Sequence, residues 1–330
     1  MGTVDRDTER KTLAILKVLS EASEALGSIA ISRDLERHGV FLSERAVRYH
    51  LRMTDERGYT APMGRDGRII TADGLEELRL ALAPEQVGFI IERLQLLAFN
   101  TTFDPARKAG LVPINTSIFS AKEFGDALHE MKLAFNTGLC ASRLVAVANE
   151  GEKIGTRIVQ RGKVALATVC GVVVNGVLLM SSVPIESRFG GVLELRNNKP
   201  RRFVAIIKYD GTSLDPSEQY IRARMTAVRE AAASGTGRIL ANFREILAPS
   251  RAVVEKRIEE LKAAGINAVY LLGNTSEPIC QIDVGMNRVG MVLLGGLNPV
   301  AAAAEAGFEV ENAAESGLIE YGRLVDIDHI

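Results

Sequence analysis

Three arginines recur along one segment at a spacing that suits nucleic-acid recognition. Arg45, Arg48 and Arg52 occupy positions i, i+3 and i+7, so they share one face of a helix. Val47 and Leu51 are apolar and are predicted to face the core. A recognition helix presents its side chains to base edges, and arginine forks pair with guanine or grip phosphate. The alternative is an ordinary solvated helix face.

The flanking residues predict a winged helix-turn-helix around these arginines. Ser43 suits the N-cap of the arginine-bearing helix, while Ser32 suits the N-cap of a shorter helix that stops at Gly39. We expect residues 28–30 to be extended, and residues 59–71 to form a hairpin with its turn at 64–67. That hairpin would be the wing. The predicted DNA-contacting residues are Ser43, Arg45, Arg48, Tyr49, Arg52, Arg65 and Arg68.

Composition limits the classes of function and the cellular location that the chain can have. The 330 residues carry 40 Lys+Arg against 41 Asp+Glu, so any nucleic-acid binding must be local rather than a property of the whole surface. Three cysteines, far apart and odd in number, fit neither a disulfide framework nor a zinc site and are typical of a reducing cytoplasm. We therefore expect a cytoplasmic protein without a membrane span, because the longest apolar stretch, 164–180, is slightly short and contains Asn175-Gly176.

The chain beyond the wing predicts a connector and a larger domain. Boundaries are expected at 1–83 for the winged helix, 84–105 for a connector helix or dimer contact, and 106–330 for the rest. Two stretches, 112–166 and 238–292, alternate strands and helices at matching intervals. The fold is thus predicted to be α+β, with an N-terminal winged helix-turn-helix and an α/β domain holding an internal pseudo-twofold repeat. A crevice between the two halves would suit a ligand.

Residues typical of turns and helix caps predict the local structure of two further segments. Asn175-Gly176 lies between β-branched runs, which predicts a hairpin of strands 164–174 and 177–183. Asp215, Pro216 and Glu218 predict a helix start. The tail, 308–330, is either a solvated end or an arm on another subunit, and its apolar residues favour the arm.

Residues 42–51 (LSERAVRYHL) and 64–71 (GRDGRIIT) resemble the winged helix of archaeal nitrogen-regulation repressors of the NrpR family, and a related module precedes some ribonucleases. The resemblance continues through TVCG at 168–171, NGVLL at 175–179, RFGG at 188–191 and SLDP at 213–216. It also includes MT at 225–226, GTG at 235–237, NFREI at 242–246 and GGLNP at 295–299.

The resemblance implies a dimeric repressor that binds an inverted-repeat operator in double-stranded DNA and represses nitrogen-assimilation genes. It further implies an effector domain that senses 2-oxoglutarate, which releases the DNA. The chain has one effector domain where other members carry two, so a second NrpR-type chain is a candidate partner. No cofactor is implied besides this effector.

A dicarboxylate site needs cations or helix N-termini, with donors for the ketone. Arg188, beside two glycines that allow close backbone approach or form a strand kink, is the leading cation. Arg202, Lys208, Arg244 and Arg288 are further candidates. Cys170 fits packing better than reactivity. The predicted effector-binding residues are Arg188, Gly190, Gly191, Thr168, Cys170, Asn175, Ser187 and Ser213.

No catalytic set or metal-ligand spacing is found in the sequence, because the four histidines are scattered and the phosphate-loop motif is absent. The expectation is therefore a regulator and not an enzyme. Two alternatives stay open: an enzyme acting on a small 2-oxo acid with a winged-helix appendage, and an RNA-binding module.

Overall fold

The computed structural model describes residues 6–22, 24–37, 39–64, 66–81, 89–155 and 157–330. The chain divides into two compact units, Met1–Gly88 and Phe89–Ile330. The predicted connector, 84–105, is split by this division: residues 82–88 lie outside the described part, and residues 89–105 belong to the larger unit. The first helix of that unit, α6 (Ile90–Phe99), packs on its neighbours there instead of standing alone.

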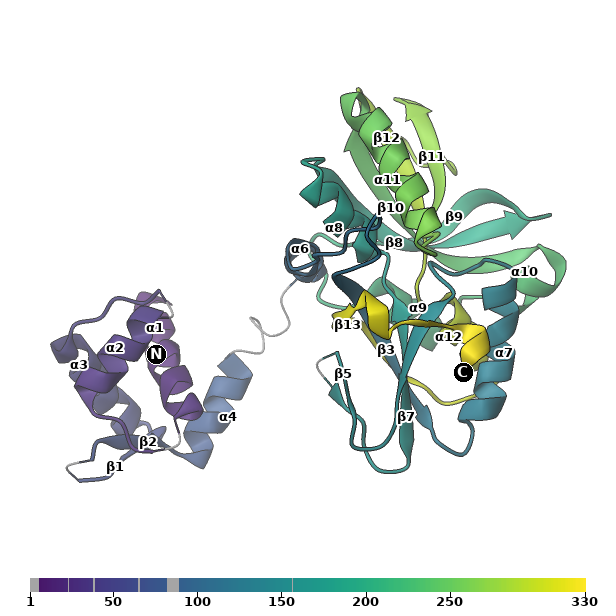
Figure 1. Cartoon of the computed structure of the whole chain (residues 1–330). Coiled ribbons are helices and arrows are strands. Elements are labelled where there is room, and N and C mark those ends of the chain that lie inside the picture. The colour runs from purple at the N-terminus through teal and green to yellow at the C-terminus, as the bar shows by residue number, and fades with distance from the viewer. Residues whose placement is uncertain (1–5, 23, 38, 65, 82–88, 156) are drawn as a thin grey trace. The chain divides into compact units, whose positions relative to one another are not determined.

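The smaller unit is a three-helix core with a two-stranded wing (Figure 1). It comprises α1 (Arg6–Glu21), α2 (Ser28–Arg37), α3 (Glu44–Glu56), β1 (Thr60–Pro62), β2 (Arg68–Ile70) and α4 (Ala72–Ala81). Ile15, Leu35, Val47 and Leu51 are buried together. Because the apolar residues of each helix recur at helical spacing, one stripe per helix closes this core. The predicted winged helix-turn-helix is confirmed.

One local prediction in this unit is wrong. Residues 28–30 are helical, not extended, and Ser32 lies inside α2 rather than at its N-cap. The Ser32 hydroxyl donates a hydrogen bond to the Leu42 carbonyl at 2.5 Å. Starting the helix at Ser28 places Ile31 and Leu35 on one buried face, and this tertiary gain outweighs the local capping signal at Ser32.

The larger unit contains two five-stranded antiparallel sheets (Figure 1). The first has the order β13-β3-β7-β4-β14, with β3 (Leu111–Ser120), β4 (Leu144–Ala148), β7 (Lys163–Val169), β13 (Glu311–Glu320) and β14 (Val325–Asp326). The second has the order β11-β12-β10-β8-β9, with β8 (Ile185–Arg196), β9 (Lys199–Lys208), β10 (Gly237–Leu247), β11 (Val269–Thr275) and β12 (Arg288–Leu294). A small hairpin pairs β5 (Lys153–Ile154) with β6 (Arg157–Ile158).

Helices cover these sheets. They are α7 (Phe124–Asn136), α8 (Val172–Met180), α9 (Pro216–Arg222), α10 (Val228–Ser234), α11 (Arg251–Ala263) and α12 (Asn298–Glu305), with short 3-10 turns at Ala248–Ser250, Tyr321–Arg323 and Ile327–His329. Two apolar cores result. One gathers side chains of α7 and α12 between the sheets and helices, and the other gathers those of α8 and α11.

The predicted internal repeat is confirmed by the topology. The order β3, α7, β4, β7, α8 matches the order β10, α11, β11, β12, α12. In each half the third strand of the set lies between the other two, giving β3-β7-β4 and β10-β12-β11. The strand that follows each half then crosses over: β8 pairs with β10, and β13 pairs with β3. The two halves are therefore locked together by exchanged strands.

The predicted hairpin at Asn175-Gly176 is wrong, because both residues lie inside α8. A side chain at Gly176 would come within 2.4 Å of the Thr101 Cβ, so the glycine lets α8 approach the segment after α6. Residues 172–178 of this helix are all buried, and a buried helical run of this kind cannot be told from strands by periodicity.

The tail also differs from the expected intermolecular arm. Its strands β13 and β14 pair with β3 and β4 of the same chain and complete the first sheet. Arg143 fixes the end of the tail by binding Asp326 and Asp328, with a shortest distance of 2.5 Å between Nη2 and the Asp328 carboxylate. Within the described part of the chain, every helix is too short or too polar to cross a membrane.

Candidate functional sites

The arginine face of α3 has the geometry that the sequence predicts. Ser43 caps the helix, since its hydroxyl accepts a hydrogen bond from the Ala46 N–H at 3.3 Å. Arg45, Arg48 and Arg52 are exposed, whereas Val47 is buried. The cap fixes where the helix begins, and thereby which residues project from its first turns.

Two side chains on this surface, Tyr49 and Arg48, differ in whether an ion pair already holds them. Tyr49 is 62% exposed and lies beside the arginines. Arg48 pairs with Glu44 one turn earlier, at 2.6 Å between Nη2 and Oε1. An exposed ion pair of this kind contributes little stability, so it exchanges readily for a phosphate or a base. The face therefore offers cationic and aromatic groups to a partner.

Arg68 does not fit its predicted role at the wing. Its side chain is only 27% exposed, and its Nε donates to both carboxylate oxygens of Asp55, at 2.8 and 3.1 Å. This pair joins β2 to α3, so we assign Arg68 to the base of the wing rather than to DNA contact. Arg65, the other predicted wing residue, lies outside the described residues.

The larger unit contains a buried arginine without a carboxylate partner. Arg244 on β10 is 1% exposed. Its closest polar contacts are the Phe243 carbonyl at 3.2 Å and the Asn175 side-chain oxygen at 3.4 Å, and it lies over the Tyr209 ring at 4.9 Å. Among the described residues, no carboxylate comes within ion-pair distance of it. A buried charge is costly unless it is paired, so this arrangement indicates a site for an anion.

Arg244 lines a cavity of about 20 Å³ at the junction of the two halves. The starts of α8 and α12 both reach it, through Gly171 and Val172 on one side and Gly296 and Leu297 on the other. The first N–H groups of a helix have no carbonyl partner within it and attract anions. This cavity, called the Arg244 cavity below, is also lined by Leu94, Asn115, Cys170, Tyr209, Asp215, Ser217, Asn242, Ala314 and Glu315.

The cavity follows from the internal repeat. The Cys170 N–H donates to the Pro113 carbonyl at 2.9 Å, and the Gly295 N–H donates to the Leu240 carbonyl at the same distance. Asn115 and Asn242 each follow that carbonyl residue by two positions. Equivalent helix starts and equivalent asparagines thus meet at one point. The predicted repeat, 112–166 and 238–292, includes both asparagines but ends before both helix starts.

The acids in the cavity titrate abnormally. Burial raises the pKa of Asp215 to about 6, although its carboxylate caps α9 by accepting from the Glu218 N–H at 3.0 Å. Burial, followed by repulsion from Asp215, raises the pKa of Glu315 to about 8. Burial also raises the pKa of the Cys170 thiol, so it is an unreactive packing residue at neutral pH.

The predicted effector residues are only partly brought together. Cys170 lines the cavity, and Thr168 lies just outside it, accepting from the Asn115 side-chain amide at 3.4 Å. Asn175 links Arg244 to Ser187, whose hydroxyl accepts from its amide at 2.9 Å. Ser213 lies in the loop before α9 and is not part of the lining.

Arg188, the leading cation predicted from the sequence, is already neutralised by acids of the same unit. Its guanidinium lies 3.1 Å from the buried Glu245 carboxylate and 3.5 Å from Glu186, and Arg288 shares both acids. Of the further candidate cations, Arg244 is the one that is buried without an ion pair among the described residues. Gly190 and Gly191 act through close packing, because added side chains would meet Pro216 and Phe203 within 2.8 Å.

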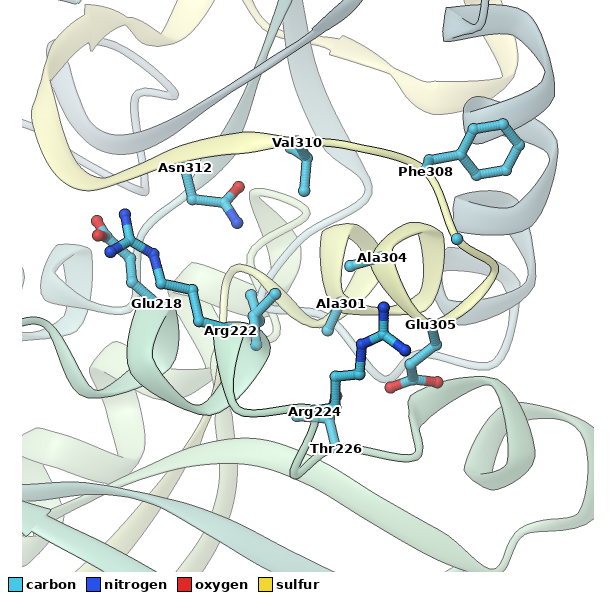
Figure 2. A pocket seen from close by; sticks show the side chains of 12 residues that line it. Glu218, Arg222, Arg224, Thr226, Ala301, Ala304, Glu305, Phe308, Val310 and Asn312 are labelled. Atoms are coloured by element: carbon cyan, nitrogen blue, oxygen red, sulfur yellow. The ribbon is translucent and has the colours of Figure 1, made fainter.

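A larger hollow of about 400 Å³ lies beside α9 and α12. Figure 2 shows Arg222 and Arg224 in it together with Glu218 and Glu305. Both acids hold backbone N–H groups, Glu218 that of Ala314 and Glu305 those at the start of α10. Because the two arginines are exposed to water, their charges do not require a ligand, unlike that of Arg244.

Comparisons with known proteins agree with both units. A family model described as NrpR regulatory domains NRD1 and 2 matches residues 87–326, and one described as the ribonuclease R winged-helix domain matches residues 13–78. The global nitrogen regulator NrpRI of Methanosarcina mazei is 34% identical over 324 residues, 98% of this chain and 100% of that protein.

Two further relatives extend the comparison. The global nitrogen regulator NrpR of Methanocaldococcus jannaschii is 32% identical over 96% of this chain, which spans only 55% of that protein. A crystal structure of a nitrogen repressor-like protein from Methanococcus jannaschii superposes with a TM-score of 0.62 and 27% identity, covering 73% of this chain and 99% of that one.

Proposed function

The chain belongs to the NrpR family, and we propose that it is a transcriptional repressor of nitrogen-assimilation genes whose DNA is released by 2-oxoglutarate. The α3 arginine face binds the operator, and the Arg244 cavity binds the effector. The observation that carries this proposal is the buried, unpaired guanidinium of Arg244 in the regulatory unit. Among the described residues no carboxylate lies within ion-pair distance of it, although Glu315 lines the same cavity and is close enough to interact with its charge.

The chemistry of the cavity suits a 2-oxo dicarboxylate. The Arg244 fork can hold one carboxylate through two N–H groups. The starts of α8 and α12 add main-chain donors and favourable dipoles. The Asn242 oxygen already accepts from the Tyr209 hydroxyl at 2.6 Å, which directs the amide NH₂ of Asn242 to another acceptor, such as the effector's ketone or carboxylate.

Family-resembling segments converge on this cavity although they are far apart in the sequence. Segments 168–171, 213–216, 242–246 and 295–299 each supply lining residues. A packing role alone does not require four separate segments to place polar groups around one unpaired charge. This convergence supports the effector assignment.

The test is a DNA-release titration with the full chain. A fluorescent duplex carrying the inverted-repeat upstream sequence of a nitrogen-assimilation gene is bound, and 2-oxoglutarate is added at millimolar concentration. We expect anisotropy to fall as DNA is released, while succinate, which lacks the ketone, acts more weakly. Binding that ignores 2-oxoglutarate would remove the effector assignment. Quantifying 2-oxoglutarate afterwards separates a sensor, which returns it unchanged, from an enzyme.

RNA is a second candidate partner, because the smaller unit matches a ribonuclease R winged-helix model. The same labelled duplex can be challenged with structured RNA or unlabelled operator. Displacement by RNA at lower concentrations than by operator DNA would favour an RNA-binding regulator.

A further inference from the structure

The Arg244 cavity is too small for its proposed ligand. Its volume of about 20 Å³ holds about one water molecule, whereas the effector is a five-carbon dicarboxylate. One wall must therefore move when the effector enters. Most walls are helix starts or central strands packed on both faces, and these resist displacement.

One wall is built differently. In β13 the register with β3 shifts between Ala313 and Gly317, so residues 314–316 lie opposite Asn115 alone. This segment is called the 314–316 bulge. The backbone N–H groups of its first two residues donate to side chains instead of to the backbone of a neighbouring strand. The Ala314 N–H donates to Glu218 at 2.8 Å, and the Glu315 N–H donates to Asn115 at 3.1 Å.

Glu315 also has an unfavourable backbone conformation and a carboxyl oxygen without a hydrogen bond. Its φ of 53° lies in the left-handed region, which is unfavourable for a residue with a side chain. Its Oε2 atom is buried and makes no hydrogen bond. Strain and an unsatisfied carboxyl oxygen together lower the cost of moving this side chain out of the cavity.

Arg93 connects the bulge to α6. The Arg93 Nε lies 3.8 Å from the Glu315 Oε2. The same helix contributes Leu94 to the cavity wall, and its buried residues pack on Cys170, Val172 and Tyr209. Among the described residues, α6 is the helix that follows α4 in the sequence, so a change at Glu315 reaches the N-terminal end of the larger unit.

We propose that Glu315 is a displaceable plug of the Arg244 cavity: a small dicarboxylate enters by moving the 314–316 bulge, and this releases Arg93 and loosens α6. The proposal rests on the proposed function and assigns its regulation. The displaced side chain has room, because Asn312 lines the hollow of about 400 Å³ on one side of the bulge while Ala314 lines the cavity on the other.

The first test removes the plug. In Glu315→Ala the cavity is vacated, so 2-oxoglutarate should bind about tenfold more tightly by calorimetry, as expected when a closed state no longer lowers apparent affinity. DNA affinity without effector should fall correspondingly. Glu311→Ala is the matched control, since Glu311 is on the same strand and pairs with Arg157 at the surface. Glu315→Gly, which tolerates a φ of 53°, provides a second variant if the alanine protein folds poorly.

The second test asks whether Glu315 and Arg93 act as a pair. Arg93→Met should shift effector and DNA affinities in the same direction as Glu315→Ala, and the double variant should resemble each single one. Additive effects in the double variant would overturn the link to α6. Loss of effector binding in both Glu315 variants would overturn the plug, because it would make Glu315 a ligand contact.

Failure of the inference is distinguishable from failure of the function. If the wild-type chain releases DNA with 2-oxoglutarate but both Glu315 variants behave as Glu311→Ala does, the plug is wrong and the repressor assignment stands. If the wild-type chain ignores 2-oxoglutarate, the proposed function itself fails.

Discussion

The protein uses arginine in two opposite ways. On α3, Arg45, Arg48 and Arg52 are exposed to water, and Arg48 also pairs with Glu44. On β10, Arg244 is buried, and no carboxylate of the described residues lies within ion-pair distance of it. The exposed set suits a partner that binds through many weak, salt-sensitive contacts, as DNA does. The buried arginine suits a small anion that fits into an enclosed site in the larger unit.

The largest effect should come from the buried arginine. Arg244→Met removes the cation while keeping most of the side-chain volume. We expect effector affinity to fall about 100-fold, because a charge-assisted bidentate contact in a buried site is among the strongest hydrogen-bonded contacts. Calorimetry with 2-oxoglutarate measures this.

The control for this prediction is stability and DNA binding. An unpaired buried charge does not favour folding, so the thermal midpoint of Arg244→Met should equal or exceed that of the wild type. DNA affinity without effector should be retained. A variant that unfolds, or that still responds fully to 2-oxoglutarate, would contradict the assignment of Arg244.

The exposed set should show smaller single effects. Arg45→Ala or Arg52→Ala should weaken operator binding about tenfold each, while the fold is unchanged, since each loses one base or phosphate contact. Arg10→Ala on α1 is the matched exposed control. Anisotropy over a range of salt concentrations should also give a shallower salt slope for a lost phosphate contact. Equal affinities for all three variants would place DNA on another face.

The affinity for the effector should depend on pH, because the ionisation of Glu315 differs between the closed and the open state. Glu315 faces Asp215 and Glu218 of α9, Arg93, Arg244, Cys170 and Tyr209. In the closed state the pKa of Glu315 is about 8, whereas a carboxyl displaced into water titrates near ~4.3. The closed state thus binds more protons between these values, and acidification stabilises it.

Effector affinity should consequently fall as pH falls from about 8 to about 6.5, by less than about tenfold per pH unit. Calorimetry in matched buffers measures the slope, and Glu315→Ala should flatten it. Affinity that rises on acidification would show that protonated Glu315 donates to the effector instead of leaving the cavity.

The last expected effect is on stability and not on affinity, and it concerns the contact between α8 and the segment after α6. Gly176→Ala would bring a methyl group within 2.4 Å of the Thr101 Cβ, which should lower the free energy of unfolding by about 1–3 kcal/mol. Gly125→Ala, on a helix with open space around the glycine, is the control. Urea denaturation distinguishes them, and equal stabilities would contradict this packing.

Sequence patterns predicted features that depend on neighbours along the chain. The Ser43 cap and the spacing of the α3 arginines are of this kind, and both are found in the structure. Asn175-Gly176 was misinterpreted because a close contact with Thr101 decides its conformation, and no local signal reports that contact. Local propensity yields to tertiary packing in such buried runs.

Most residues of the Arg244 cavity could not be predicted from local sequence patterns. Arg188 looked like the free cation because its partners Glu186 and Glu245 come together only through the β8–β10 pairing and its bulge. Glu315 gave no signal, since its importance arises from a register shift in β13. Asn115 and Asn242 lie in the two halves of the predicted internal repeat, so that repeat and the family-resembling segments were the sequence features able to indicate the site.

If the chain couples the effector cavity to DNA binding, thermodynamic reciprocity must hold between its two ligands, and this can be measured directly. The measurement is the affinity for 2-oxoglutarate of the full chain, with and without saturating operator DNA, beside the affinity for DNA with and without saturating 2-oxoglutarate. Coupling requires the two ratios to be equal, and we predict that each ligand weakens the other by the same factor, about tenfold or more. An effector affinity that operator DNA leaves unchanged would contradict the account.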